Sequence, residues 1–139
     1  MKKIKVFLGG YINYTNAQNL NCRAIAEHLN KDKFEVYALK VHFGDNKKYT
    51  SKSFNCFKPF HVTQHFGFLW GILHCDVAYL PKHIDTPVWV LKLAKWLKKP
   101  IFTTIEGNVT DLSKPNLIGL FRSQQKMKTH FIYVLILIK

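Results

Sequence analysis

Residues 5–29 read KVFLGGYINYTNAQNLNCRAIAEHL, and this stretch points to the fold class. Its first part is an apolar run that stops at Gly9 and Gly10, which is typical of a strand that runs into a tight turn. Apolar residues recur at helical spacing in its second part, and Thr15 or Asn16 stands where a side chain caps a helix. The stretch therefore predicts a strand, a glycine turn and a helix.

The same alternation of strand and helix patterns continues along the chain. Such an order is typical of a parallel sheet with helices on both faces, so we expect a Rossmann-like α/β fold. Residues 1–125 are expected to form this domain, and the apolar tail 126–139 is expected to add a last strand. The further expected strands are 34–41, 54–60 and 75–81, and residues 100–108 are expected to form a strand and a turn. Further helices are expected at 86–99 and 115–126, and residues 63–74 are expected to form a helix or a turn.

Composition narrows the class of protein. The chain has 139 residues, which suit one domain, and 47% of them are hydrophobic, which argues against disorder. The 21 Lys and Arg against 8 Asp and Glu give a net charge of +13, which favours anionic partners. The chain has three cysteines and no CxxC pair, which argues against a disulfide framework and against a zinc ribbon. Free cysteines are typical of proteins in a reducing cytoplasm. The longest late apolar run is too short to cross a bilayer as a helix.

The glycine turn does not match a known nucleotide motif. The sequence GGYINYTN has two adjacent glycines and no third, so it is not a G-x-G-x-x-G fingerprint. It also lacks the Gly-Lys-Ser/Thr ending of a P-loop. Two interpretations remain open: the glycines permit only the turn, or they let a ligand approach the backbone beside a helix N-terminus.

A ligand site is expected at the carboxyl ends of the strands, where parallel sheets bind their ligands. This rim would hold residues 9–16, 81–85 and 106–110. We expect neither a cofactor nor a metal, because His61 and His65 lie among aromatic residues without an acidic partner and are interpreted as packing or surface residues. The expected substrate-binding residues are Gly9, Gly10, Tyr11, Asn13, Asn16, Glu106, Gly107 and Asn108.

Three stretches carry a resemblance to a known family. They are residues 5–39, which begin KVFLGGYINYTNAQNL and end FEVYAL, residues 75–81, CDVAYLP, and residues 98–107, KKPIFTTIEG. Together they resemble the N-terminal domain of retaining, glycogen-synthase-like glycosyltransferases, which have the GT-B architecture of two facing Rossmann domains. In that family the glycine-rich turn faces the cleft in which donor and acceptor meet. The resemblance therefore implies half of a GT-B fold.

The resemblance implies an acceptor-side domain of an enzyme that transfers sugar from a nucleotide sugar to a saccharide or lipid-linked acceptor. The paired glutamates that grip the donor belong to the family's C-terminal Rossmann domain, which these 139 residues do not contain. The tail 126–139 is accordingly also interpreted as a truncation or frameshift remnant, and the isolated chain is expected to be inactive. Glu106 replaces the histidine that the family often carries after this strand, so no catalytic residue is assigned.

Two other interpretations stay open. A basic nucleic-acid-binding or regulatory α/β domain would fit the charge, but no nucleic-acid motif organises the lysines, so nucleic acid is not an expected partner. In helix 86–99 the lysines Lys92, Lys95 and Lys99 share a polar face, and Trp89 and Trp96 share another side. That pattern suits an anionic membrane surface, although a solvated outer face is favoured. The protein is expected in the cytoplasm. Peripheral attachment to the inner face of the membrane is the alternative location.

Overall fold

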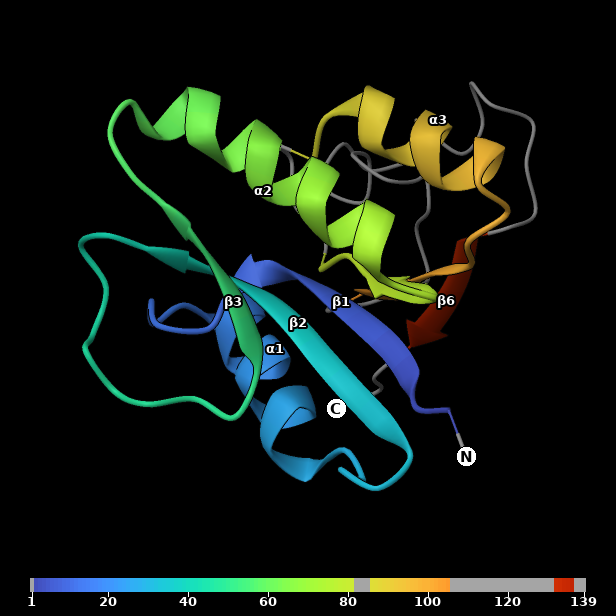
Figure 1. Cartoon of the computed structure of the whole chain (residues 1–139), viewed down its shortest axis with the longest axis horizontal. Coiled ribbons are helices and arrows are strands. Elements are labelled where there is room, and N and C mark those ends of the chain that lie inside the picture. Colours follow the sequence, from blue (N-terminus) through green and yellow to red (C-terminus); the bar gives the residue numbers. More distant parts are fainter. Residues whose placement is uncertain (1, 82–85, 106–131, 137–139) are drawn as a thin grey trace.

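The computed structural model describes residues 2–81, 86–105 and 132–136, and it shows strands and helices that alternate along the chain (Figure 1). The helix expected at 86–99 is confirmed with shifted bounds, residues 63–74 lie within a helix, and the helix expected at 115–126 lies outside the described residues. The elements are β1 (Ile4–Tyr11), α1 (Ala17–His28), β2 (Phe34–Val41), β3 (Lys52–Cys56), α2 (Phe60–His74), β4 (Val77–Tyr79), α3 (Val88–Trp96), β5 (Ile101–Ile105) and β6 (Ile132–Ile136).

All six strands form one parallel sheet in the order β3-β2-β1-β4-β5-β6. The chain starts in the middle with β1, winds outward to β3, returns to β4 and then winds out to the other edge. The predicted Rossmann-like α/β fold is confirmed. The order of winding reverses between β1 and β4, and this reversal is the place where such sheets bind ligands at their carboxyl edge.

Helix α1 covers one face of the sheet. Asn16 is its N-cap, and the Asn16 side chain accepts a hydrogen bond of 2.8 Å from the N–H of Asn19, so the second of the two expected caps is the correct one. Cys22 and Ala26 of α1 are buried against Val6 and Leu8 of β1. Because successive strand residues point to opposite faces, these two β1 side chains lie on the α1 side and their neighbour Phe7 lies on the other.

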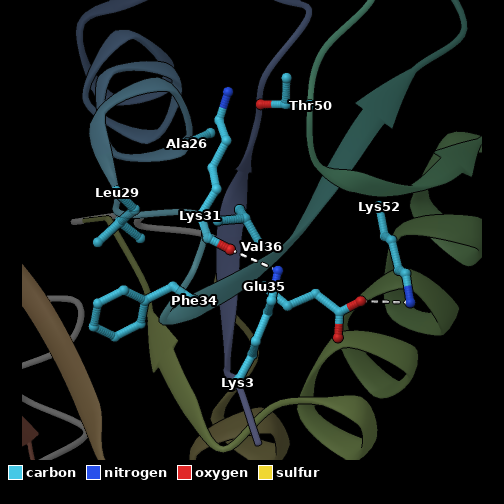
Figure 2. A pocket seen from close by; sticks show the side chains of 9 residues that line it. All are labelled: Lys3, Ala26, Leu29, Lys31, Phe34, Glu35, Val36, Thr50 and Lys52. Carbon is cyan, nitrogen blue, oxygen red and sulfur yellow. Dashed lines mark hydrogen bonds and ion pairs between the residues drawn. The ribbon is translucent and has the colours of Figure 1, made fainter. Parts of the chain in front are cut away.

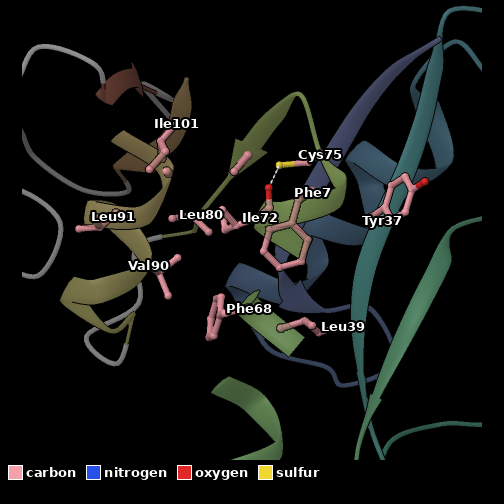
Figure 3. Close-up of a cluster of buried hydrophobic side chains, with 12 residues drawn as sticks. Phe7, Tyr37, Leu39, Phe68, Ile72, Cys75, Leu80, Val90, Leu91 and Ile101 are labelled. Carbon is pink, nitrogen blue, oxygen red and sulfur yellow. Dashed lines mark hydrogen bonds between the residues drawn. The ribbon is translucent and has the colours of Figure 1, made fainter. Parts of the chain in front are cut away.

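Helices α2 and α3 cover the opposite face, over the larger of the two apolar cores (Figure 3). Gly71 lets α2 approach the sheet closely, because a Cβ at this position would overlap the ring of Phe7. This core contains Phe7, Tyr37, Leu39, Phe68, Ile72, Cys75, Ala78, Leu80, Val90, Leu91, Ala94 and Ile101. Helices therefore lie on both faces of the sheet, as expected.

The ends of α3 explain why it is shorter than the expected helix 86–99. Pro87 has extended backbone angles, φ −62° and ψ 137°, so helical geometry begins only at Val88. At the other end Lys98 adopts φ 53°, the left-handed conformation that closes many helices. Lys99 is thus outside the helix, and its amine donates to the carbonyl oxygens of Ile72 and Leu73 at the end of α2.

Candidate functional site

The carboxyl edge beside the winding reversal is built around the end of β1. The pairing of β1 with β2 is interrupted there: Leu8 lies opposite Ala38 and Tyr11 lies opposite Leu39. Gly9 and Gly10 therefore have no partner residues in β2 and form a bulge, a feature that redirects the chain at the end of a strand. The bulge places the following loop, residues 12–16, above the sheet edge.

The space beside both glycines is occupied by the protein's own side chains. A Cβ on Gly9 would lie 2.5 Å from Cδ2 of Leu80, and a Cβ on Gly10 would lie 2.6 Å from Sγ of Cys22. Neither glycine adopts a left-handed φ. Glycine is needed here because α1 and β4 come close to β1, and not because the backbone conformation demands it.

Tyr11 connects the end of β1 to helices on both faces. Its N–H donates to Oδ1 of Asn19 on α1 at 2.8 Å. Its hydroxyl donates to Oε1 of Gln64 on α2 at 3.0 Å, and its half-buried ring lies 5.6 Å from the ring of Phe60. Of the expected substrate-binding residues that the structure describes, Tyr11 is the one whose functional group lies among aromatic side chains at the edge.

Asn13 and Asn16 have structural partners. Asn13 is buried; its Nδ2 donates to the carbonyl oxygen of Val41 at 2.8 Å, and its Oδ1 accepts from the N–H of Val41 at 2.9 Å. This side chain extends the β1–β2 pairing beyond the strand ends. Asn16 caps α1. Glu106, Gly107 and Asn108 lie outside the described residues, as do residues 82–85 and 109–110 of the expected rim.

Aromatic side chains from three neighbouring loops and helix starts meet at the carboxyl edge. Each ring lies within 5.0–6.0 Å of another: Tyr11 and Phe43 both contact Phe60, which also contacts His61, while Tyr14 and His42 contact Phe43. Four of the six residues are exposed: Phe43 at 56%, Tyr14 at 45%, and the two histidines His42 and His61. We call this set of Tyr11, Tyr14, His42, Phe43, Phe60 and His61 the aromatic rim.

The sequence analysis missed most of the aromatic rim. From sequence, His61 is interpreted as a packing or surface residue, and Tyr14 falls within the expected rim 9–16 without being named as a binding residue. Phe43 and Phe60 have no assigned role in a site. A usable signal was present, because Tyr14 and Phe43 each follow the end of an expected strand by a few residues. Residues in such positions gather at one edge when the strands run parallel.

Asp45 fixes the loop that carries Phe43. Its N–H donates to the carbonyl oxygen of Asn13 at 2.7 Å, and its carboxylate accepts from the hydroxyl of Tyr49 at 2.8 Å and from Arg23 at 3.4 Å. Partial burial works to raise the pKa of Asp45, but the hydrogen bonds from Tyr49 and the Lys47 N–H, together with the charge of Arg23, leave this pKa below its ordinary value. The loop 42–51 is thus held against the loop after β1.

Two histidines that the sequence placed at helical spacing, His61 and His65, have different surroundings. His61 belongs to the aromatic rim, whereas Nδ1 of His65 accepts a hydrogen bond of 3.0 Å from the indole of Trp89, and these two rings stack 5.9 Å apart. In the described part of the chain, no three His, Cys, Asp or Glu side chains gather as metal ligands would.

A small pocket of about 210 Å³ lies at the opposite, amino edge of the sheet (Figure 2). Apolar side chains of Ala26, Leu29, Phe34 and Val36 line it, together with Thr50 and charged residues. Three of its charged groups already bond within the protein: the Lys3 amine donates to the carbonyl oxygen of Lys31 at 2.7 Å, and Lys52 pairs with Glu35 at 2.6 Å. The carboxyl edge, with its solvent-exposed rings, is therefore the better candidate site.

In comparisons with known proteins, no protein family, no curated protein and no solved structure matches the chain. Among the described residues, no helix is both long and apolar enough to span a bilayer.

Proposed function

We propose that this chain is the acceptor-side domain of a GT-B type glycosyltransferase, an enzyme that moves sugar from a nucleotide sugar to a saccharide or lipid-linked acceptor. The family resemblance of residues 5–39, 75–81 and 98–107 motivates the proposal. The observation that carries it is the aromatic rim at the carboxyl edge, beside the reversal between β1 and β4. Ligand sites in such sheets occupy this place.

The chemistry of the aromatic rim suits a saccharide. The exposed rings of Phe43 and Tyr14 offer flat apolar surfaces for the C–H faces of sugar rings. The Tyr11 hydroxyl, the Gln64 amide and the His61 ring supply hydrogen-bonding groups beside these surfaces, and such groups can pair with sugar hydroxyls. A mostly aromatic surface with a few polar groups is typical of small-ligand sites.

We propose that this domain binds the acceptor and that sugar transfer takes place in a cleft between two domains. Sugar transfer requires that the donor on one domain be held against the acceptor on the other, and much of the rate comes from that positioning. We therefore propose that residues 1–139 alone transfer no sugar. We also propose that the domain lies in the cytoplasm, because its cysteines are free and nucleotide sugars are cytoplasmic donors. Any peripheral attachment to a membrane would then be to its inner, cytoplasmic face.

Saccharide binding can be measured by NMR on the isotope-labelled full chain, titrated with maltose and with N-acetylglucosamine disaccharide. We expect shifts confined to the loops 12–16 and 42–46 and the start of α2. The variant Phe43→Ala should weaken binding about tenfold, because a stacked ring is lost. Phe57→Ala is the matched control, since Phe57 is 58% exposed but is not part of the aromatic rim.

Two results would contradict the proposal. Shifts that Phe43→Ala and Phe57→Ala reduce equally, or no shifts at millimolar saccharide, would remove the aromatic rim as an acceptor site. Multiple-turnover transfer by residues 1–139, offered UDP-glucose, UDP-N-acetylglucosamine or GDP-mannose with saccharide and lipid acceptors, would show that the donor site lies within this chain.

A further inference from the structure

The outward face of α2 carries a stripe of exposed apolar side chains. Val62, Phe66, Leu69 and Leu73 are spaced by four, three and four residues, and each is exposed. At about 100° per residue these four positions fall within a sector of about 60°. The buried residues of the helix, among them Phe68 and Ile72, occupy the opposite side against the sheet. The stripe is thus a second apolar face on a helix whose first is already packed.

Helix α3 continues this surface beside α2. The two helices lie side by side on the same face of the sheet (Figure 1). On α3 the exposed residues are Val88, Lys92, Lys95 and Trp96, and Trp96 is 77% exposed, a large value for an indole ring. We call the exposed residues Val62, Phe66, Leu69, Leu73, Val88, Lys92, Lys95 and Trp96 the α2–α3 face.

Among the described residues, the charged side chains on the two helices of the α2–α3 face have one sign. Neither helix contains an Asp or a Glu, whereas Lys58 precedes α2 and Lys98 follows α3. Of the described residues between 57 and 105, Asp76 is the one carboxylate, and its Oδ2 accepts from the N–H of Lys5 at the amino end of β1. An occupant of this face therefore meets apolar side chains bordered by positive charge.

We propose that the α2–α3 face docks onto a membrane surface rich in anionic lipids. Aromatic and aliphatic side chains on one face with lysines beside them are typical of helices that lie in the membrane interface. The anionic headgroups attract the lysines, and the apolar side chains enter the boundary with the acyl chains. The α2–α3 face is distinct from the aromatic rim. The proposal rests on the peripheral location given under the proposed function and names the surface and the lipid charge that would produce it, while docking itself needs neither sugar nor a second domain.

Charge complementarity selects the membrane over two other occupants. A second copy of this chain would bring the lysines of two identical faces together, and like charges across an interface oppose association. A nucleic acid would match the lysines but would leave Phe66, Leu69 and Leu73 against a polar backbone, since phosphate contacts dominate such binding. An anionic lipid surface accepts both the charged and the apolar groups.

The test is flotation of the full chain with vesicles. We expect binding to vesicles of equimolar phosphatidylcholine and phosphatidylglycerol, a decrease as salt rises, and no binding to phosphatidylcholine alone. Phe66→Ser should weaken binding about tenfold, and so should Leu73→Ser. Leu20→Ser is the matched control, because Leu20 is 45% exposed on α1 at the other face of the sheet. For charge, Lys92→Glu is compared with Lys33→Glu, which lies away from the α2–α3 face.

Circular dichroism of every variant separates loss of docking from loss of fold. Equal loss of binding in Leu20→Ser and Phe66→Ser would overturn the proposal, as would the absence of binding to anionic vesicles. A dimer in sedimentation that Phe66→Ser dissociates would assign the face to a second copy instead. Binding to a DNA duplex that Lys92→Glu weakens and Phe66→Ser leaves unchanged would assign it to nucleic acid.

Discussion

Asn13 shows how a single side chain can take the place of backbone pairing. The last paired residues of β1 and β2 are Tyr11 and Leu39, so Val41, two residues further along β2, has no partner residue in β1. The Asn13 amide supplies one acceptor and one donor to the N–H and carbonyl oxygen of Val41, at 2.9 Å and 2.8 Å. Because Asn13 is buried, its loss leaves groups that water reaches poorly.

We expect Asn13→Ala to lower the free energy of unfolding by roughly 1–3 kcal/mol, because the buried N–H of Val41 loses its acceptor and the Asp45 carbonyl loses a donor. The carbonyl oxygen of Val41 keeps the N–H of Gly44 as a donor. Urea denaturation followed by circular dichroism measures this change. Asn46→Ala, at an exposed position in the neighbouring loop, serves as the control and should change stability little. Equal stability of the two variants would mean that the amide pairing contributes nothing.

The carboxyl of Asp45 makes stability depend on pH. A carboxyl with a lower pKa in the folded than in the unfolded chain stabilises the fold at pH above its ordinary value of 3.8. That contribution is lost as the pH falls through the lowered pKa of the folded chain. We expect the unfolding free energy of the wild-type protein to fall through this acid range and that of Asp45→Asn to fall less. Urea denaturation at a series of pH values tests this, and parallel curves would contradict it.

At the scale of elements, α1 packs closely on β1 because Gly10 has no side chain. Gly10 faces Cys22 and Asn19, and a Cβ there would lie 2.6 Å from Sγ of Cys22 and 3.0 Å from Oδ1 of Asn19. Cys22 is buried, so the sulfur has little room to move. The helix can sit this close to the strand only because Gly10 has no side chain.

Gly10→Ala should cost roughly 1–3 kcal/mol of stability through this overlap. The cost should be smaller in a Cys22→Ala background, because the sulfur that meets the new methyl group is gone. A double-mutant cycle by urea denaturation measures the difference. Leu20→Ala, exposed on the same helix, should be additive with Cys22→Ala; additivity of Gly10→Ala as well would mean that the overlap is relieved elsewhere.

At the scale of the whole molecule, the winding order gathers distant residues at one edge. Tyr14 follows β1, Phe43 follows β2 and Phe60 opens the helix after β3, and all three meet because their strands are parallel neighbours. The same winding puts α1 on one face and α2 and α3 on the other. The proposed saccharide site and the proposed membrane face therefore occupy different surfaces of one sheet.

The reactivity of the three cysteines can be used to measure unfolding of the whole domain. Cys22 belongs to α1 and is buried against β1, while Cys56 ends β3 and Cys75 follows α2, and all three are buried. Burial raises the pKa of Cys22 to about 12 and the pKa values of Cys56 and Cys75 to about 11, so the reactive thiolate is scarce. We expect Ellman's reagent to label all three slowly and together, at a rate that rises with urea as unfolding does.

The variant Asn46→Cys is the control for this labelling. Its added thiol lies at an exposed position and should react at once, while the three native thiols stay protected. Fast labelling of one native cysteine without urea would show that its element opens independently of the rest of the sheet.

The sequence by itself determined the alternation of strands and helices and narrowed the cap of α1 to Thr15 or Asn16. These features depend on local spacing: apolar residues at helical intervals, alternation along a strand, and an Asn or Thr before a helix are visible within a few residues. The parallel sheet followed from the order of the elements. The bounds of α3 were less predictable, because Lys98 adopts a left-handed φ that glycine usually supplies.

Only the tertiary structure decided the roles of individual residues. Residues 60–74 are apolar on nearly every side, so packing on the sheet alone determines that Phe68 is buried and Phe66 is 58% exposed. The sequence left open whether Gly10 permits only a turn or also lets a ligand approach, and the structure shows that Cys22 fills the space beside it. Asn13 bonds to a residue 28 positions away. Such contacts join segments that are distant along the chain, and no local pattern records which side chains will meet.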